Sequence, residues 1–164
     1  MGSPLQRKIK QNASFKSKAH EATLSLLVAG IHIRRESEAI FKKYGLSFSY
    51  YNVLRILRGA PDEGYPRCDI IDRMLDPAPD VTRLIDQMIK KGWVKRTRSD
   101  SDRRVSLHWI TPKGLGLLEH IDNEINELNA QYDAKIDDAD LEHLIRICSY
   151  IYSGTSTAPA KEDC

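Results

Sequence analysis

The sequence DVTRLIDQMIKKGWVKRTRSDSDRRVSLHWITPKG, residues 80–114, decides how this chain folds. Its first part places apolar side chains at helical spacing and stops at Gly92, which predicts a short amphipathic helix over Asp80–Lys91. Two strands are predicted next, at 93–97 and 105–110, with a charged tip between them. Thr111 followed by Pro112 then begins another helix.

Helix, β-hairpin with a basic tip and helix is the plan of a winged helix-turn-helix. In such a domain one helix fits a major groove of DNA and the hairpin, the wing, reaches along the backbone.

Upstream of this unit, two further helices are predicted. Ser47 is the predicted N-cap of the first one. Pro66 suits the first turn of the next helix. The buried side of that helix is predicted to carry Ile70, Ile71, Met74 and Leu75.

Long helices are predicted on both sides of this unit. A helix over Phe15–Tyr44 has apolar residues on two faces and ends at Gly45. Beyond the hairpin, apolar side chains recur at coiled-coil spacing, at Leu118, Ile121, Ile125, Leu128 and Tyr132, and again at Leu141, Leu144, Cys148 and Ile151. The apolar area on these helices is more than the small predicted helix-turn-helix unit could cover, which favours a homodimer. The alternative is that they pack only on one another within one chain.

The fold class that follows is mainly α (α+β): a winged helix-turn-helix with a two-stranded wing, flanked by N- and C-terminal dimerisation helices. The predicted boundaries are a flexible lead-in at 1–14, dimerisation helices at 15–45 and 112–152, a DNA-binding domain at 46–111 and a disordered tail at 153–164. With 164 residues the chain is long enough for one domain with a real core.

Composition narrows the class of protein. The hydrophobic share of 41% and the charged share of 29% are those of a soluble globular protein, and the apolar runs are too short to span a membrane. Without a visible signal peptide, the expected location is the cytoplasm. The three cysteines and five histidines lack metal-ligand spacing, so no metal or cofactor is expected. Nor is there a glycine-rich phosphate loop or a nucleophile motif, which argues against an enzyme.

Charge is concentrated where the hairpin is predicted. The whole chain carries a formal charge of +2, yet residues 83–104 contain eight basic residues against three acidic ones. A local basic patch on a nearly neutral chain is typical of phosphate contact. A merely solvated hairpin is the alternative.

Several motifs in this order resemble the multiple-antibiotic-resistance regulator (MarR) family of bacterial transcription factors. They are Asp80–Asp86 of the predicted recognition helix, Lys91–Arg96, Asp102-Arg103-Arg104, and Leu107 with Ile110–Gly114, where the second strand leads into the next helix. The resemblance extends over roughly Ala22–Tyr152. It implies a homodimeric regulator that binds double-stranded DNA at a pseudo-palindromic operator, expected to be a repressor released by a small ligand.

Candidate DNA contacts lie on the recognition helix and the wing. Thr82 and Arg83 are predicted on its outward side, able to reach base edges, although Arg83 could instead pair with Asp86 or Asp80. The resemblance implies that Arg104 enters the minor groove and that Asp102 holds the wing through an ion pair. Contacts to phosphates are expected from Gln87, Lys90, Arg96, Arg98 and Arg103.

The resemblance also implies an effector pocket for a small aromatic acid between the dimerisation helices and the head. Its candidate lining is His32, Arg35, Tyr44, Tyr50 and Tyr51, with ordinary packing of a helix junction as the alternative. Two other functions stay open. One is a winged-helix module that binds protein and not DNA. The other is a redox-sensing regulator that uses a cysteine such as Cys68.

Overall fold

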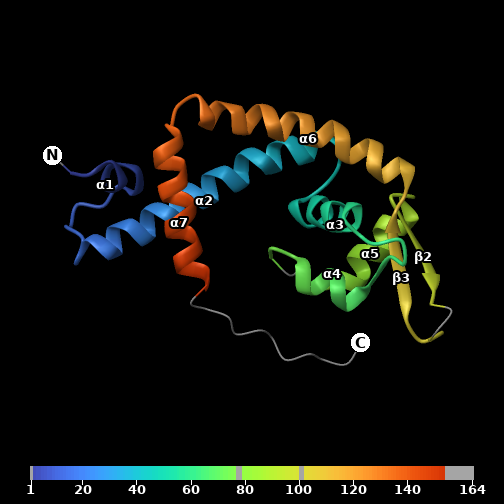
Figure 1. Cartoon of the computed structure of the whole chain (residues 1–164). Helices are drawn as coiled ribbons and strands as arrows, with labels where there is room; N and C mark the ends of the chain where they lie inside the picture. Colours follow the sequence, from blue (N-terminus) through green and yellow to red (C-terminus); the bar gives the residue numbers. More distant parts are fainter. Residues whose placement is uncertain (1, 77–78, 100–101, 154–164) are drawn as a thin grey trace.

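The computed structural model describes residues 2–76, 79–99 and 102–153 (Figure 1). Its helices are α1 (Pro4–Ile9), α2 (Lys18–Lys43), α3 (Phe48–Arg58), α4 (Arg67–Arg73), α5 (Val81–Lys90), α6 (Pro112–Asp133) and α7 (Asp138–Ser153). Its strands are β1 (Tyr65–Pro66), β2 (Val94–Arg98) and β3 (Ser106–Ile110). The winged-helix prediction is confirmed. The predicted tail beyond Ser153 and the wing residues Asp100 and Ser101 lie outside the described residues.

Residues 46–111 form a head, and buried side chains of α3, α4 and α5 build its core. Val53, Leu54 and Ile70 are fully buried there, as is Met88 of α5. Leu118 and Ile121 of α6 enter the same core and are also fully buried. The first half of the coiled-coil seam predicted on α6 therefore belongs to the head, because α6 packs on α3 before it leaves the domain.

Among the described residues the sheet has three strands in the order β1-β3-β2, one more than predicted. Tyr65 pairs with His108 and Pro66 with Leu107. A two-residue strand is too short to show a period-2 pattern, and Pro66 is tolerated because it lies on an edge. Pro66 is consequently the N-cap of α4 and not part of its first turn.

The end of α4 also differs from the prediction. The helix stops at Arg73, and Met74 takes an extended conformation. Met74 is still buried, but Leu75, predicted on the buried side, is 79% exposed. Helical spacing no longer decides which way a side chain points once the chain has left the helix.

Local sequence signals do set most helix ends. Asp80 Oδ1 accepts from the backbone N–H of Arg83 at 2.9 Å and caps α5. Thr111 Oγ1 accepts from the backbone N–H of Gly114 at 3.1 Å and caps α6. Gly45 has a φ of +68°, the left-handed conformation that ends a helix, as predicted after α2.

The N-terminal segment, predicted as a flexible lead-in, contains the short helix α1. Ser3 and Gln6 form a capping box, and Pro4 occupies the first turn of α1. Leu5 is buried, and α1 packs against α2. A six-residue helix is marginal alone, so this contact with α2 is what stabilises it. The long helix accordingly starts at Lys18 and not at Phe15.

The long helices extend away from the head. Figure 1 shows α2 and α6 leaving it together, and α7 at the end far from the wing. None of the residues of α7 is buried. Large apolar side chains are exposed on α2 at Leu27, Ile31 and Ile33, and on α7 at Leu144, Ile145, Ile147 and Ile151. Within the described ranges, none of the helices has the length and apolar character needed to cross a membrane.

Candidate DNA-binding surface

The recognition helix α5 turns one side to the core and the other to solvent. Val81, Ile85 and Met88 are buried, while Thr82 and Arg83 are exposed. This is the predicted orientation. It places a hydroxyl and a guanidinium on the first outward turn of the helix, where a side chain can reach base edges in a major groove.

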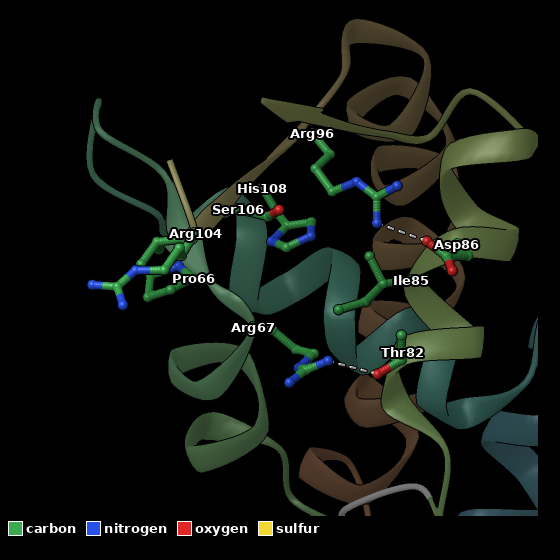
Figure 2. A pocket seen from close by; sticks show the side chains of 10 residues that line it. Pro66, Arg67, Thr82, Ile85, Asp86, Arg96, Arg104, Ser106 and His108 are labelled. Atoms are coloured by element: carbon green, nitrogen blue, oxygen red, sulfur yellow. Dashed lines mark hydrogen bonds and ion pairs between the residues drawn. The ribbon is translucent and has the colours of Figure 1, made fainter. Parts of the chain in front are cut away.

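Two arginines from outside α5 are hydrogen-bonded to it (Figure 2). Arg67 Nη1, at the start of α4, donates to Thr82 Oγ1 at 3.0 Å. Arg96 Nη1, on β2, donates to Asp86 Oδ1 at 2.9 Å. Asp86, considered as a partner of Arg83, thus pairs with the wing instead. Both pairs tie the recognition helix to neighbouring elements.

Gln87 lies on the side of α5 that faces α3. It is half-buried, and its amide oxygen accepts a hydrogen bond from the Tyr50 hydroxyl of α3. Tyr50 also packs edge-on against Trp93, with ring centroids 6.0 Å apart. Gln87, a candidate phosphate contact, is therefore held toward α3, whereas Lys90, one turn further on, is exposed.

A cavity of about 160 Å³ separates α5 from the wing. Figure 2 shows Arg67 and Arg96 on opposite sides of it, with Ile85 and His108 between them. His108 is 4% exposed and its Nδ1 lies 3.1 Å from the carbonyl oxygen of Tyr65. Burial lowers the pKa of His108, and the nearby guanidinium groups of Arg96 and Arg67 lower it further. The imidazole is therefore neutral at pH 7.

The wing carries the ion pair expected between Asp102 and Arg104. Asp102 Oδ1 accepts from the Arg104 backbone N–H at 2.9 Å and from Arg104 Nε at 3.2 Å. These bonds, the backbone one first, lower the pKa of Asp102. The Arg104 side chain nevertheless remains 92% exposed. Arg98 and Arg103 are exposed beside it, so the wing presents cations to solvent.

The five candidate effector residues lie in different surroundings, two of them on the surface and three in contact with other side chains. His32 and Arg35 are exposed on α2. Tyr44 donates to Glu124 Oε1 at 2.7 Å, and Tyr50 is committed to Gln87. Tyr51 is 8% exposed and stacked on Phe41, with centroids 4.6 Å apart.

The hydroxyl of Tyr51 joins a polar network between α3 and α6. It donates to Asp122 Oδ1 at 2.9 Å and accepts from Arg55 Nη1 at 3.0 Å. Arg58 pairs with the same carboxylate. Tyr51 thus connects α3 of the head to α2 and α6, because its ring packs on Phe41 and its hydroxyl donates to Asp122.

Sequence reasoning missed Arg67 and His108. Both depend on β1, which brings the start of α4 against β3. One signal was present for Arg67: a cation in the first turn of a helix is disfavoured by the helix dipole, so an arginine there suggests another role. Among the described residues, no group of three His, Cys, Asp or Glu side chains is placed to hold a metal ion.

Comparison with known proteins agrees with this geometry. A family model described as MarR family matches residues 44–105. The crystal structure of a MarR transcription factor from Planctomyces limnophilus is 34% identical, with a TM-score of 0.63, over 84% of this chain and 99% of that one.

Two further structures share the fold at lower identity. The Staphylococcus aureus MepR–DNA complex has a TM-score of 0.72 at 14% identity, over 80% of this chain and 96% of that one. CouR from Rhodococcus jostii RHA1 bound to p-coumaroyl-CoA has a TM-score of 0.70 at 23% identity, over 88% and 99%.

Fold and surface together define a winged-helix transcription factor. The chain belongs to the MarR family of transcriptional regulators. It is accordingly a DNA-binding regulator and not an enzyme.

Proposed function

We propose that this protein is a homodimer that binds a pseudo-palindromic operator and represses transcription until a small ligand releases it. The observation that carries the proposal is the outward side of α5 next to a wing with exposed Arg98, Arg103 and Arg104. A helix that displays polar side chains beside a cationic hairpin matches a major groove and the backbone next to it. The MepR–DNA complex, which has the same fold, supports this.

In the proposed complex, α5 lies in the major groove. Thr82 and Arg83 contact base edges, and Arg104 enters the adjacent minor groove, where a narrow A·T-rich segment has the most negative potential. Contacts to phosphates come from Gln87, Lys90, Arg96, Arg98 and Arg103. Asp102 contributes by holding the backbone of Arg104 in place.

The dimer is supported by the apolar surface of α7. A sixteen-residue helix without a buried residue has little to stabilise it in a monomer. Tyr150 and Ile145 are 83% and 66% exposed, although apolar side chains on one helix favour burial. A second copy that covers α7 and the exposed side of α2 removes this surface from water. Two recognition helices about 34–36 Å apart would then match successive major grooves.

The proposed effector is an aromatic carboxylate such as salicylate, with Arg35 of α2 pairing with the carboxylate. CouR, bound to p-coumaroyl-CoA, supports an aromatic ligand in this fold. Since the Tyr51 ring is stacked on Phe41, it is not accessible for stacking with the ligand. The ligand would instead change the contact between α3 and α6. Calorimetry with and without operator tests this: linkage requires the same factor, roughly 5- to 150-fold, in both directions.

In-vitro selection from a random pool of duplex DNA tests the main proposal. We expect a two-fold symmetric consensus whose half-sites lie about 10 base pairs apart, one helical turn. Retention of DNA without any consensus would contradict sequence-specific regulation. A protein that retains no DNA at low salt would instead favour a protein-interaction module.

A further inference from the structure

The cavity between α5 and the wing contains an arginine to which the family resemblance assigns no role. Arg67 reaches it from the first turn of α4, on the side opposite Arg96 (Figure 2). Its side chain is exposed at the rim, so a ligand from solvent can meet it. Thr82, the proposed base contact, lines the same cavity.

The Arg67 guanidinium decides how the Thr82 hydroxyl can bind. Arg67 Nη1 donates to Thr82 Oγ1 at 3.0 Å. A hydroxyl that accepts from a guanidinium has its own proton left to donate elsewhere. Thr82 is thereby set as a donor, which suits an acceptor in the major groove such as O6 or N7 of guanine or O4 of thymine.

Charge in the cavity favours an anion. Its lining includes the guanidinium groups of Arg67 and Arg96 and one carboxylate, Asp86. Arg104 also lines it, but its guanidinium points away from the cavity and pairs with Asp102 (Figure 2). The Asp86 carboxylate is already paired with Arg96. His108 is neutral at pH 7, so it neither adds to nor offsets the excess.

Arg67 can serve Thr82 and an anion together. A guanidinium has five N–H donors in a planar fork, and Thr82 takes one of them. The others can bind a phosphate oxygen, for which this geometry is well suited.

We propose that Arg67 binds a backbone phosphate of the operator at this cavity and, through the same guanidinium, orients the Thr82 hydroxyl toward a base. The inference rests on the proposed function. It makes the phosphate contact and the base contact interdependent, because one side chain holds both. Phosphate contacts by themselves carry no sequence information, so Arg67 acts on specificity only through Thr82.

The phosphate contact is tested with operator duplexes in which one phosphate at a time is replaced by a neutral methylphosphonate. Wild-type protein is expected to lose about tenfold in affinity at one position per half-site that the Arg67→Ala variant no longer senses. Arg67→Ala should also lower the salt slope by about 0.9 per contact. An unchanged sensitivity profile in Arg67→Ala would overturn the contact.

The coupling to Thr82 is tested with Thr82→Val, which removes the hydroxyl but keeps the shape. In the wild-type background it should cost about tenfold on the operator and relax preference at one base pair. In the Arg67→Ala background the same change should cost less than threefold. Independent effects of the two substitutions would show that Arg67 does not orient Thr82.

Arg67→Lys is the matched control. It keeps the charge but replaces the planar fork with a single ammonium group. The salt slope should stay unchanged, whereas base preference should relax as in Thr82→Val. A Lys variant that keeps full base preference would mean that charge alone matters, which overturns the orienting role. Because Arg67 and Thr82 are both exposed, thermal unfolding of these variants should match that of the wild type.

Titration of the DNA-free protein with inorganic phosphate distinguishes the source of the anion. Saturable binding that Arg67→Ala removes, together with no methylphosphonate-sensitive position, would assign the cavity to a free phosphate and overturn the DNA contact.

Failure of the proposed function gives a different set of results from failure of the Arg67 contact. If the wild type selects no DNA, that function fails. If Arg104→Ala weakens operator binding while Arg67→Ala does not, only the role of Arg67 fails.

Discussion

At the scale of single residues, Arg104 is held at its backbone and exposed at its guanidinium. Its backbone N–H donates a hydrogen bond to Asp102, while its side chain is 92% exposed. Arg104→Ala should weaken operator binding by about 1.5–3 kcal/mol, because a bond to a charged group is lost. It should lower the salt slope by about one. Binding measured over a salt series checks both.

The control for Arg104→Ala is Lys8→Ala, which removes an exposed charge from α1, far from the wing in Figure 1. It should leave both affinity and salt slope unchanged. Both variants should remain dimers, since neither residue contributes to the core. Unchanged affinity and unchanged sequence preference in Arg104→Ala would reject the minor-groove assignment.

His108 links stability to pH. Burial lowers its pKa in the folded chain, so the unfolded chain takes up a proton first as the pH falls below about 6.5. Above that pH its contribution to stability is complete, and it is lost progressively as the pH falls toward the folded pKa. The facing Arg96 and Arg67 also lower the pKa of His108, while the hydrogen bond to the Tyr65 carbonyl and, more weakly, Asp86 raise it.

Urea unfolding at pH 7.5 and pH 5.5 measures this effect. The wild type should lose more stability between the two pH values than His108→Gln, which cannot titrate. The other histidines are common to both proteins and cancel in the difference. An equal loss in the two proteins would show that His108 is not responsible.

At the scale of elements, Gly114 in the first turn of α6 lies close to the backbone of Trp93. A Cβ at Gly114 would lie 2.4 Å from the carbonyl oxygen of Trp93 and 2.8 Å from a carbon of Ile110. Gly114→Ala should therefore destabilise the chain by about 1–3 kcal/mol, as overpacking does.

Gly116, in the same helix, is the matched control, because a Cβ there meets nothing within 4 Å. Gly116→Ala should be neutral or stabilise by up to about 1 kcal/mol through helix propensity. Urea unfolding of the pair measures the difference. Similar values for the two variants would contradict the close approach between α6 and Trp93.

The cap of α5 is a second element that can be tested. Asp80→Ala removes the acceptor for the Arg83 N–H and should cost about 1 kcal/mol of unfolding free energy. Asp80→Asn keeps a capping oxygen and should remain close to the wild type. If the two variants lose equal stability, the charge of Asp80 and not its capping bond is what matters.

At the scale of the whole molecule, the exposed face of α7 predicts a dimer. Light scattering should give twice the 18.7 kDa mass of the chain at micromolar concentration. Ile151→Lys should shift the mass toward the monomer and make the melting temperature depend more on concentration. Glu142→Lys, on the same helix but polar already, should leave the mass unchanged. A folded wild-type monomer would refute the dimer.

Sequence alone determined the helices with strong caps and a clear apolar stripe. The periodicity of α5, the Thr111 cap and the Gly45 stop are local properties, so they were readable without a structure. The Asp102–Arg104 pair was also expected, as an implication of the resemblance to the MarR family, and the two side chains are hydrogen-bonded in the structure.

Tertiary structure decided what depends on contacts between distant residues. Strand β1 forms only because β3 lies beside Tyr65 and Pro66, and without it the Arg67–Thr82 pair has no basis in the sequence. Tyr51 was a candidate for lining an effector pocket, with ordinary packing as the alternative; its ring is stacked on Phe41 of α2 and its hydroxyl donates to Asp122 of α6. Periodicity shows that a helix has an apolar face; which neighbour buries that face is decided only when the chain has folded.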